Sequence, residues 1–362
     1  MAIVNSAVNS PSAPRQAWEA LRFFATIVVI LIPLICCFGV LEAIAWRVGE
    51  TRSMEDLARW QSRKLERMWR GGDGRSYLTY KVARVGLLKP QVIMLGQSRA
   101  NYIVASMMKP YTFYNSGLTA WTFNQYRRFL ELITADGYAP KVLFFNLDYW
   151  MFSKGFDDYW VERFYEKPPT HWEDLKVIVD ELMKEPIVLL YRLPYANDLK
   201  GIYAVRYGSG FRQDGSLDPS VIPSNANRLD NDGINIGNPP TVLGAGFDEE
   251  QIVAFDRFVA FAKSKNIALI GIQVPYYAKV VNGLNHEPWA GIWREARSDS
   301  TRRYFEGKGV IFFDFADMPQ YRDNPNNFVD SIHPGPNVVQ DVMQRVLSDP
   351  RVRALLPNLQ AG

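Results

Sequence analysis

Short apolar runs alternate with amphipathic stretches over most of the chain, and this alternation predicts its fold. The apolar runs predict five buried strands, at residues 91–95, 111–115, 141–147, 267–274 and 310–315. Apolar residues at helical spacing predict helices at residues 122–135, 247–265 and 336–347. Buried strands separated by amphipathic helices are typical of a parallel sheet that is covered on both faces. We therefore predict a three-layer, doubly wound α/β domain with a five-stranded, mainly parallel sheet.

Two segments depart from this alternation. Residues 151–246 are rich in aromatic residues, Pro, Gly and Asn. We predict that they form a large insertion after the third strand, helical at residues 172–183, which acts as a cap or as one wall of a cleft. Residues 54–70 are charged and amphipathic, and they predict a helical stalk that ends at the glycines of residues 71–74.

The N-terminal part of the chain contains a long apolar run. Residues 23–41 carry no charge, and the run continues past Glu42 to Trp46. A membrane-spanning helix needs about 20 apolar residues. A signal peptide would have a shorter apolar core and a small-residue cleavage site, and a buried soluble helix would have a polar face. We therefore predict one transmembrane anchor.

This anchor sets the expected domain boundaries. They are a tail at residues 1–22, the anchor at 23–46, the stalk at 47–74 and the α/β domain at 75–362. More positive residues follow the anchor than precede it, which favours a cytoplasmic C-terminal domain, but this rule weakens before a long domain and leaves the orientation open. The flanking residues are Arg15, Arg22, Arg47, Arg52, Arg59, Arg63 and Lys64.

The composition excludes several classes of protein. Hydrophobic residues make up 48% of the chain and aromatic residues 14%, which excludes a disordered protein. The net charge of +3 is small and the charges are mixed, so we expect no nucleic-acid partner. Cys36 and Cys37 are adjacent, and the sequence has no Cys/His cluster, so we predict no disulfide, no structural zinc and no other cofactor. We expect His171 and His286 to be surface residues.

The first predicted strand ends abruptly at Gly96-Gln97-Ser98-Arg99. Ligands of doubly wound sheets bind beyond the carboxyl ends of the strands, where Ser98 would lie. Serine after a strand is also a common helix N-cap, and this residue alone does not distinguish a nucleophile from a cap.

A second motif follows the last predicted strand. Asp330 lies three residues before His333, one of three histidines in the chain. A carboxylate at this spacing can accept a hydrogen bond from Nδ1 of the imidazole and leave Nε2 free to activate a serine. The alternative is an Asp/His pair on the surface of a turn that contains Pro334 and Gly335.

Together these motifs resemble the SGNH (GDSL-type) hydrolase superfamily over residues 91–348, outside the insertion. Residues 96–99 are similar to its first block, with Gln97 where Asp is commoner, and residues 115–117 are similar to the second. Residues 146–148 fall where the third block, Gly-x-Asn, is expected, and Asp330 and His333 match the last. The resemblance implies a flavodoxin-like fold.

The resemblance also implies roles for individual residues. Ser98 would be the nucleophile, His333 the general base and Asp330 the residue that orients the base. Gly117 would donate its N–H to an oxyanion hole.

The third block departs from the family pattern. The family has an Asn that donates to the oxyanion, whereas an ionised Asp148 can only accept hydrogen bonds. Either the pKa of Asp148 is raised or another group donates. Asn146, two residues earlier and on the same strand face, is a candidate. A structural Asp148 that caps a turn is equally compatible with the sequence.

The anchor, the insertion and the strand-ending Leu147-Asp148 are similar to a narrower branch of membrane-anchored proteins related to alginate O-acetyltransferases. This resemblance implies a bacterial inner-membrane protein with a periplasmic domain, a carbohydrate substrate and a multi-pass membrane acyltransferase as partner. Arg99 and Tyr149 would then lie among the substrate-binding residues. The aromatic pairs 149–150 and 159–160 would stack on sugar rings or pack in the core.

Two functions follow as hypotheses. The first is serine-dependent acyl-ester chemistry, in which a Ser98 acyl-enzyme transfers an acetyl group to a cell-surface polysaccharide or removes one from it. The alternative is a non-catalytic carbohydrate-binding or assembly subunit that retains the fold. A short distance between Ser98 Oγ and His333 Nε2 would favour the first.

Overall fold

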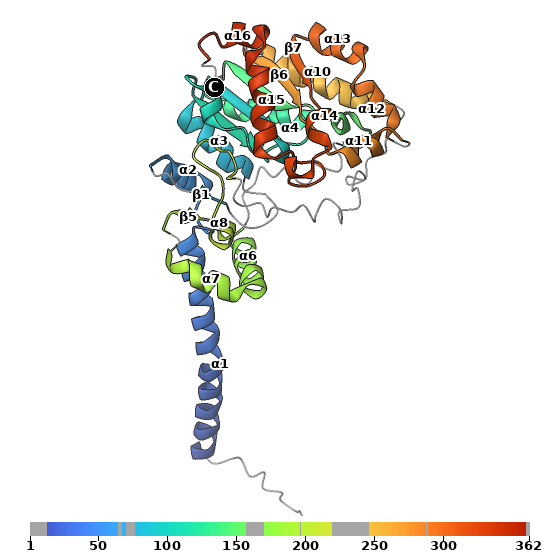
Figure 1. Cartoon of the computed structure of the whole chain (residues 1–362). Helices are drawn as coiled ribbons and strands as arrows, with labels where there is room; N and C mark the ends of the chain where they lie inside the picture. Colours follow the sequence, from blue (N-terminus) through green and yellow to red (C-terminus); the bar gives the residue numbers. More distant parts are fainter. Residues whose placement is uncertain are drawn as a thin grey trace, which may run out of the picture.

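A computed structural model of the chain describes residues 13–63, 67–69, 77–156, 170–195, 197–218, 246–286 and 289–359. The molecule has an α/β domain from which one long helix projects (Figure 1). A smaller group of helices lies between the two, beside the near end of the long helix (Figure 1).

The α/β domain is built on a parallel sheet of five strands in the order β3-β2-β4-β6-β7. In chain order this is 2-1-3-4-5, the order of flavodoxin-like sheets, whose direction of winding reverses between the first and third strands. This sheet confirms the predicted α/β fold. The strands are β2 (Val92–Gly96), β3 (Phe113–Gly117), β4 (Val142–Asn146), β6 (Ala268–Gln273) and β7 (Val310–Asp314).

Alternate residues of each strand point to opposite faces of the sheet, and helices cover both faces. Ile93 and Leu95 pack on one face with helices α3 (Tyr77–Leu88), α4 (Phe123–Ile133), α10 (Glu249–Ser264), α12 (Ala290–Ala296) and α13 (Asp299–Gly307). Val92 and Met94 pack on the other face with α15 (Pro336–Ser348) and α16 (Pro350–Leu355). The strands are therefore apolar throughout, because both of their faces are buried.

The long projecting helix is α1 (Ala13–Val48), which is long and apolar enough to cross a membrane. The most apolar stretch of α1 is not buried against any other part of the described structure. Its 36 residues span about 54 Å at the usual helical rise. Cys36 and Cys37 are free thiols on its exposed surface.

The predicted stalk is shorter than expected and is not a free connector. Helix α2 (Met54–Arg63) packs Leu57 and Ala58 against Tyr80 of α3, so it belongs to the surface of the α/β domain. Residues 67–68 form a strand, β1 (Arg67–Met68), which pairs in parallel with β5 (Leu199–Lys200). The prediction of a helix through residue 70 was wrong because a distant strand pairs with this segment.

The helical part of the insertion, residues 171–207, packs against α1. Helices α6 (His171–Lys184), α7 (Pro186–Arg192) and α8 (Ile202–Tyr207) bury Leu175, Ile178 and Leu189 against Ala45 and Val48 of α1. We call the three helices α6, α7 and α8, the two-stranded sheet of β1 and β5, and the end of α1 the anchor module. Residues 157–169 and 219–245 of the predicted cap lie outside the described residues.

The last described part of the insertion covers the edge strand of the main sheet. The N–H of Asn115 in β3 donates to the carbonyl of Asp214 at 2.7 Å. The buried Nζ of Lys81 joins the two segments, because it donates to the carbonyls of Asn115 (2.8 Å) and Gly215 (2.6 Å). The outward backbone groups of Asn115 on the edge strand β3 are thus satisfied within the chain, and the segment covers this part of the sheet edge.

Candidate active site

Ser98 lies at the carboxyl end of β2, at the point where the winding direction of the sheet reverses. Strand β2 ends at Gly96, and Ser98 opens a short 3₁₀ turn, η1 (Ser98–Ala100). Gln97 occupies the cap position of this turn and makes no side-chain cap. The side chain of Ser98 is therefore not a helix cap. Its Oγ lies 2.5 Å from Nε2 of His333.

His333 lies in a tight loop that Asp330 organises. One carboxylate oxygen, Oδ1 of Asp330, accepts hydrogen bonds from the backbone N–H groups of Ile332 and His333, both at 2.9 Å. Such self-bonding turns are typical of Asp. The same carboxylate lies 2.8 and 2.7 Å from Nδ1 of His333, so the imidazole is held from both its backbone and its ring.

Ser98, His333 and Asp330 thus form one continuous chain of hydrogen bonds. Burial disfavours the ionised carboxylate of Asp330, but the hydrogen bonds and charge of His333 outweigh it and lower the pKa to about 2. An ionised Asp330 accepts from Nδ1–H and leaves Nε2 as the acceptor that faces the Ser98 hydroxyl. The side chains of His333 and Asp330 are 22% and 28% exposed, so solvent reaches the histidine–aspartate pair.

Arg99 and Asp148 form a buried ion pair beneath the site. The guanidinium donates to Asp148, to the Tyr276 hydroxyl and to the carbonyls of Val274 (2.5 Å) and Pro275 (3.0 Å). Asp148 precedes a 3₁₀ turn, η3 (Tyr149–Phe152), but does not cap it. Burial raises the pKa of Asp148, and the positive charge of Arg99 opposes that effect. Asp148 therefore forms an ion pair and does not cap the turn, and its second oxygen, Oδ2, is buried without a partner among the described residues.

Arg99 and Tyr149, expected among the substrate-binding residues, are only 1% and 3% exposed. Tyr149 packs edge-on against Trp150, Tyr276 and Trp293. Arg99 is thus buried in its ion pair with Asp148, and Tyr149 is buried among aromatic side chains. The second aromatic pair, residues 159–160, lies outside the described residues.

The expected oxyanion donor at Gly117 already has a partner. Its N–H donates to Oδ1 of Asn115 at 2.7 Å, while Nδ2 of Asn115 donates to the carbonyls of Ala100 and Ile103, both at 2.8 Å. These bonds fasten the end of β3 to the segment that carries Ser98. A Cβ at residue 117 would lie 2.6 Å from Oδ1 of Asn101, so a side chain there would force this amide to move.

Asn146, the alternative donor, ends β4 directly beside the end of β2. Its Oδ1 lies 2.2 Å from the position that a Cβ on residue 96 would take, so the amide fits only because that residue is Gly96. Asn146 is fully buried, and neither atom of its amide has a hydrogen-bond partner among the described residues. Buried polar groups without partners are rare in proteins, and each one calls for an explanation.

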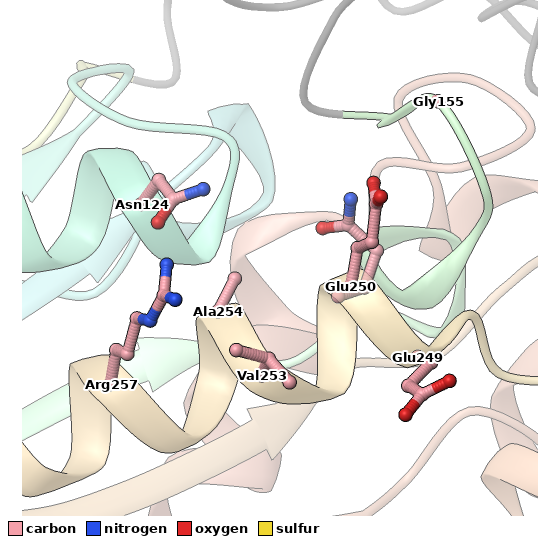
Figure 2. Close-up of a pocket in the computed structure, with 8 residues that line it drawn as sticks. Asn124, Gly155, Glu249, Glu250, Val253, Ala254 and Arg257 are labelled. Atoms are coloured by element: carbon pink, nitrogen blue, oxygen red, sulfur yellow. The ribbon is translucent and has the colours of Figure 1, made fainter.

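A separate polar pocket of about 580 Å³ opens between α4 and α10 (Figure 2). Asn124 of α4 and Arg257 of α10 extend toward each other across it, and Glu249 and Glu250 lie at the start of α10 (Figure 2). Neither Ser98 nor His333 lines this pocket. It is therefore a different surface from the serine–histidine pair.

Two residues near the site were missed in the sequence. Tyr276, at the carboxyl end of β6, donates its hydroxyl to Asp148 at 3.1 Å, and its place just after a predicted strand was a usable signal. Asn101 lies against Gly117 with an Oδ1 that has no partner among the described residues. No sequence pattern indicates that contact. His171 and His286 are exposed, as predicted.

The fold and site define an α/β protein with a Ser–His–Asp hydrogen-bond chain at the carboxyl edge of a parallel sheet. No model of a known protein family matches the chain, and a search of curated proteins finds no match either.

Proposed function

We propose that this protein is an SGNH-type, membrane-anchored enzyme that carries out acyl-ester chemistry through a Ser98 acyl-enzyme. The observation that carries the proposal is the hydrogen-bond chain Ser98 Oγ–His333 Nε2 and His333 Nδ1–Asp330. It has the order of groups found in serine hydrolases. Its position after the first strand of a 2-1-3-4-5 sheet also supports the SGNH assignment.

The reaction divides into two half-reactions. Ser98 Oγ attacks the ester carbonyl and gives its proton to Nε2 of His333. The bond from the carbonyl carbon to the leaving oxygen then breaks, and the imidazolium protonates the departing alcohol. A sugar hydroxyl or water next attacks the acyl-enzyme and loses its proton to His333; the bond from the acyl carbon to Ser98 Oγ then breaks, and the imidazolium returns a proton to Oγ. Asp330 stabilises the imidazolium that forms in each half-reaction.

The oxyanion needs donors that the site does not already use. The N–H of Ser98 is one. In the turn that Ser98 opens, the backbone hydrogen bonds are donated by the N–H groups of Ala100 and Asn101, so the turn does not use the N–H of Ser98. The Nδ2 of Asn146 is the second, since it is buried beside Gly96 without a partner among the described residues. This assignment replaces Gly117, whose N–H donates to Asn115, and Asp148, whose Oδ1 accepts from Arg99 and Tyr276.

We also propose that α1 anchors the enzyme in the bacterial inner membrane with the α/β domain in the periplasm. The length and exposure of α1 support the anchor. The periplasmic side, a cell-surface polysaccharide substrate and a multi-pass acyltransferase partner rest on the resemblance of the motifs. A reporter fused after Gly362 that is active only in the cytoplasm would refute the orientation.

A fluorophosphonate probe tests the nucleophile. We expect the probe to label the full chain in detergent micelles and to leave Ser98→Ala unlabelled. Ser106→Ala is a matched control, because Ser106 is a nearby serine in the next 3₁₀ turn (Ala105–Met108). Equal labelling of wild type and Ser98→Ala would refute the proposal. An acetyl ester incubated with and without an oligosaccharide then separates transfer from hydrolysis.

The engaged N–H of Gly117 and the ion-paired Asp148 favour a second candidate, a non-catalytic carbohydrate-binding or assembly subunit. It predicts no labelling of the wild type and binding of oligosaccharide that survives Ser98→Ala. Labelling that depends on Ser98 would exclude it.

A further inference from the structure

Helix α7 and the end of α6 expose an unusually apolar surface. Ile187, Leu190 and Tyr191 of α7 are 81%, 59% and 72% exposed, and Met183 of α6 is 79% exposed. Leu189 is the buried residue of α7. A helix on the surface of a soluble domain normally turns charged or polar residues outward. A cluster of exposed large apolar side chains instead marks an interaction surface.

This surface continues onto the apolar part of α1. Met183 and Leu190 share an apolar groove of about 560 Å³ with Cys36 and Val40 of α1. The charge-free run of residues 23–41 would span about 28 Å, close to the thickness of a bilayer core. Residues 36–40 lie within its last 9 Å or so. The exposed face of α7 therefore lies at the depth of one outer edge of that core.

Residues around this face have the chemistry of a membrane–water interface. Trp172, which is 72% exposed, packs edge-on against Phe38 of α1. Tyr191 is a second exposed aromatic side chain, and such residues concentrate at head-group level. Lys184, at the end of α6, pairs with Glu181 at 2.8 Å and keeps 58% of its side chain exposed; its long apolar stem would let the ammonium exchange this partner for a lipid head group.

We propose that α7 and the end of α6 lie in the head-group region of the lipid leaflet next to the α/β domain, as a second membrane contact beside α1. The proposal rests on the proposed anchoring of α1. Lipid is the occupant because the surface is continuous with a helix that would be surrounded by lipid at the same depth. Helices of this kind embed their apolar face about 5–10 Å into the interface. The anchor module would then fix the α/β domain at a set height and tilt above the bilayer.

Depth-dependent fluorescence quenching tests this contact in the full chain. The background carries Cys36→Ser and Cys37→Ser, and single cysteines are introduced by Ile187→Cys, Val29→Cys or Val253→Cys. Val253 is the matched control, since it is an apolar residue of α10, 40% exposed, on the α/β domain. Each variant is labelled with bimane. It is then placed in vesicles of phosphatidylethanolamine and phosphatidylglycerol that contain lipids with a nitroxide near the head group or deep in the acyl chain.

We expect the probe at residue 187 to lose most of its fluorescence with the shallow nitroxide. The probe at residue 29 should lose most of its own with the deep nitroxide, and the probe at residue 253 should lose none with either. Adding Leu190→Glu should reduce quenching at residue 187 and leave residue 29 unchanged. If the probe at residue 187 were unquenched while the probe at residue 29 was quenched, this inference would be refuted and the proposed membrane anchor would stand. That holds whether the surface then faced water or another protein. No quenching at residue 29 would overturn both.

Discussion

The buried ion pair of Arg99 and Asp148 gives the sharpest test of how the site is supported. Asp148→Asn keeps the size of the side chain and an oxygen that can accept from Arg99 and Tyr276. It removes the negative charge and leaves a guanidinium that is 1% exposed without its counter-ion. The change therefore isolates the electrostatic contribution of the pair from its packing.

Breaking a buried pair by removing one charge typically costs about 3–5 kcal/mol. Here we expect about 3 kcal/mol, at the lower end. The guanidinium keeps the carbonyls of Val274 and Pro275 and lies 3.8 Å from the centre of the Tyr276 ring. Equilibrium chemical unfolding of the full chain in detergent micelles at neutral pH, followed by tryptophan fluorescence, measures the loss.

An exposed ion pair supplies the matched control. Asp136 pairs with Lys89 at 3.6 Å, and both side chains are 58% exposed, so Asp136→Asn should leave the unfolding curve unchanged. The double variant Arg99→Met with Asp148→Leu should recover part of the loss, since no unpaired charge remains. Equal unfolding curves for Asp148→Asn and Asp136→Asn would refute the reasoning.

Three further predictions follow from the geometry. Asn146→Ala should lower the rate of ester hydrolysis about 10²–10³-fold, as loss of one oxyanion donor does, and a rate equal to wild type would exclude Asn146 as a donor. Gly215→Ala should unfold more easily than Gly137→Ala in the same denaturant series, and equal curves would contradict the clash. Both glycines have positive φ (+77° and +85°), but only at Gly215 would a Cβ lie 2.2 Å from the Asn115 carbonyl. Asp330 is more acidic in the folded state (pKa about 2, against 3.8), so it stabilises the fold above pH ~4, and about 2 kcal/mol is lost as the pH falls toward 2. A pH series of unfolding curves should lack this loss in Asp330→Asn.

The strands could be predicted because burial on both faces leaves a continuous apolar run in the sequence. The predicted strand 91–95 is offset by one residue from the observed β2 (Val92–Gly96). The predicted strand 310–315 ends one residue after the observed β7 (Val310–Asp314). Strand β3 begins two residues later than predicted, because Tyr111 and Thr112 are apolar or β-forming but precede the ladder. The helix at 122–135 could be predicted in the same way, since the apolar residues at helical spacing form the buried face of α4.

The site could be predicted only as far as local motifs reach. Ser98, Asp330 and His333 could be singled out because they lie in short local patterns, one at the end of β2 and one in the loop before α15. Partners that come together through the fold alone leave no such pattern. Residues 115–117 resemble a block whose glycine N–H is an oxyanion donor, whereas the N–H of Gly117 donates to the side chain of Asn115 in the fold. The packing of α6, α7 and α8 against α1 could not be predicted either, because neither segment contains a sequence pattern that indicates this contact.

The anchor module has a consequence for how the chain reaches its fold. Ala45 and Val48 bury themselves against Leu175 and Ile202, and Arg67 pairs with Leu199, all far away along the chain. A ribosome has already released β2, β3 and β4 before these partners emerge, while β6 and β7 are still to be made. The anchor module and the α/β domain are therefore synthesised in alternation. The anchor module is begun before β2, β3 and β4 and completed after them, and the α/β domain is completed last. A fragment cut between them would remove native partners from both.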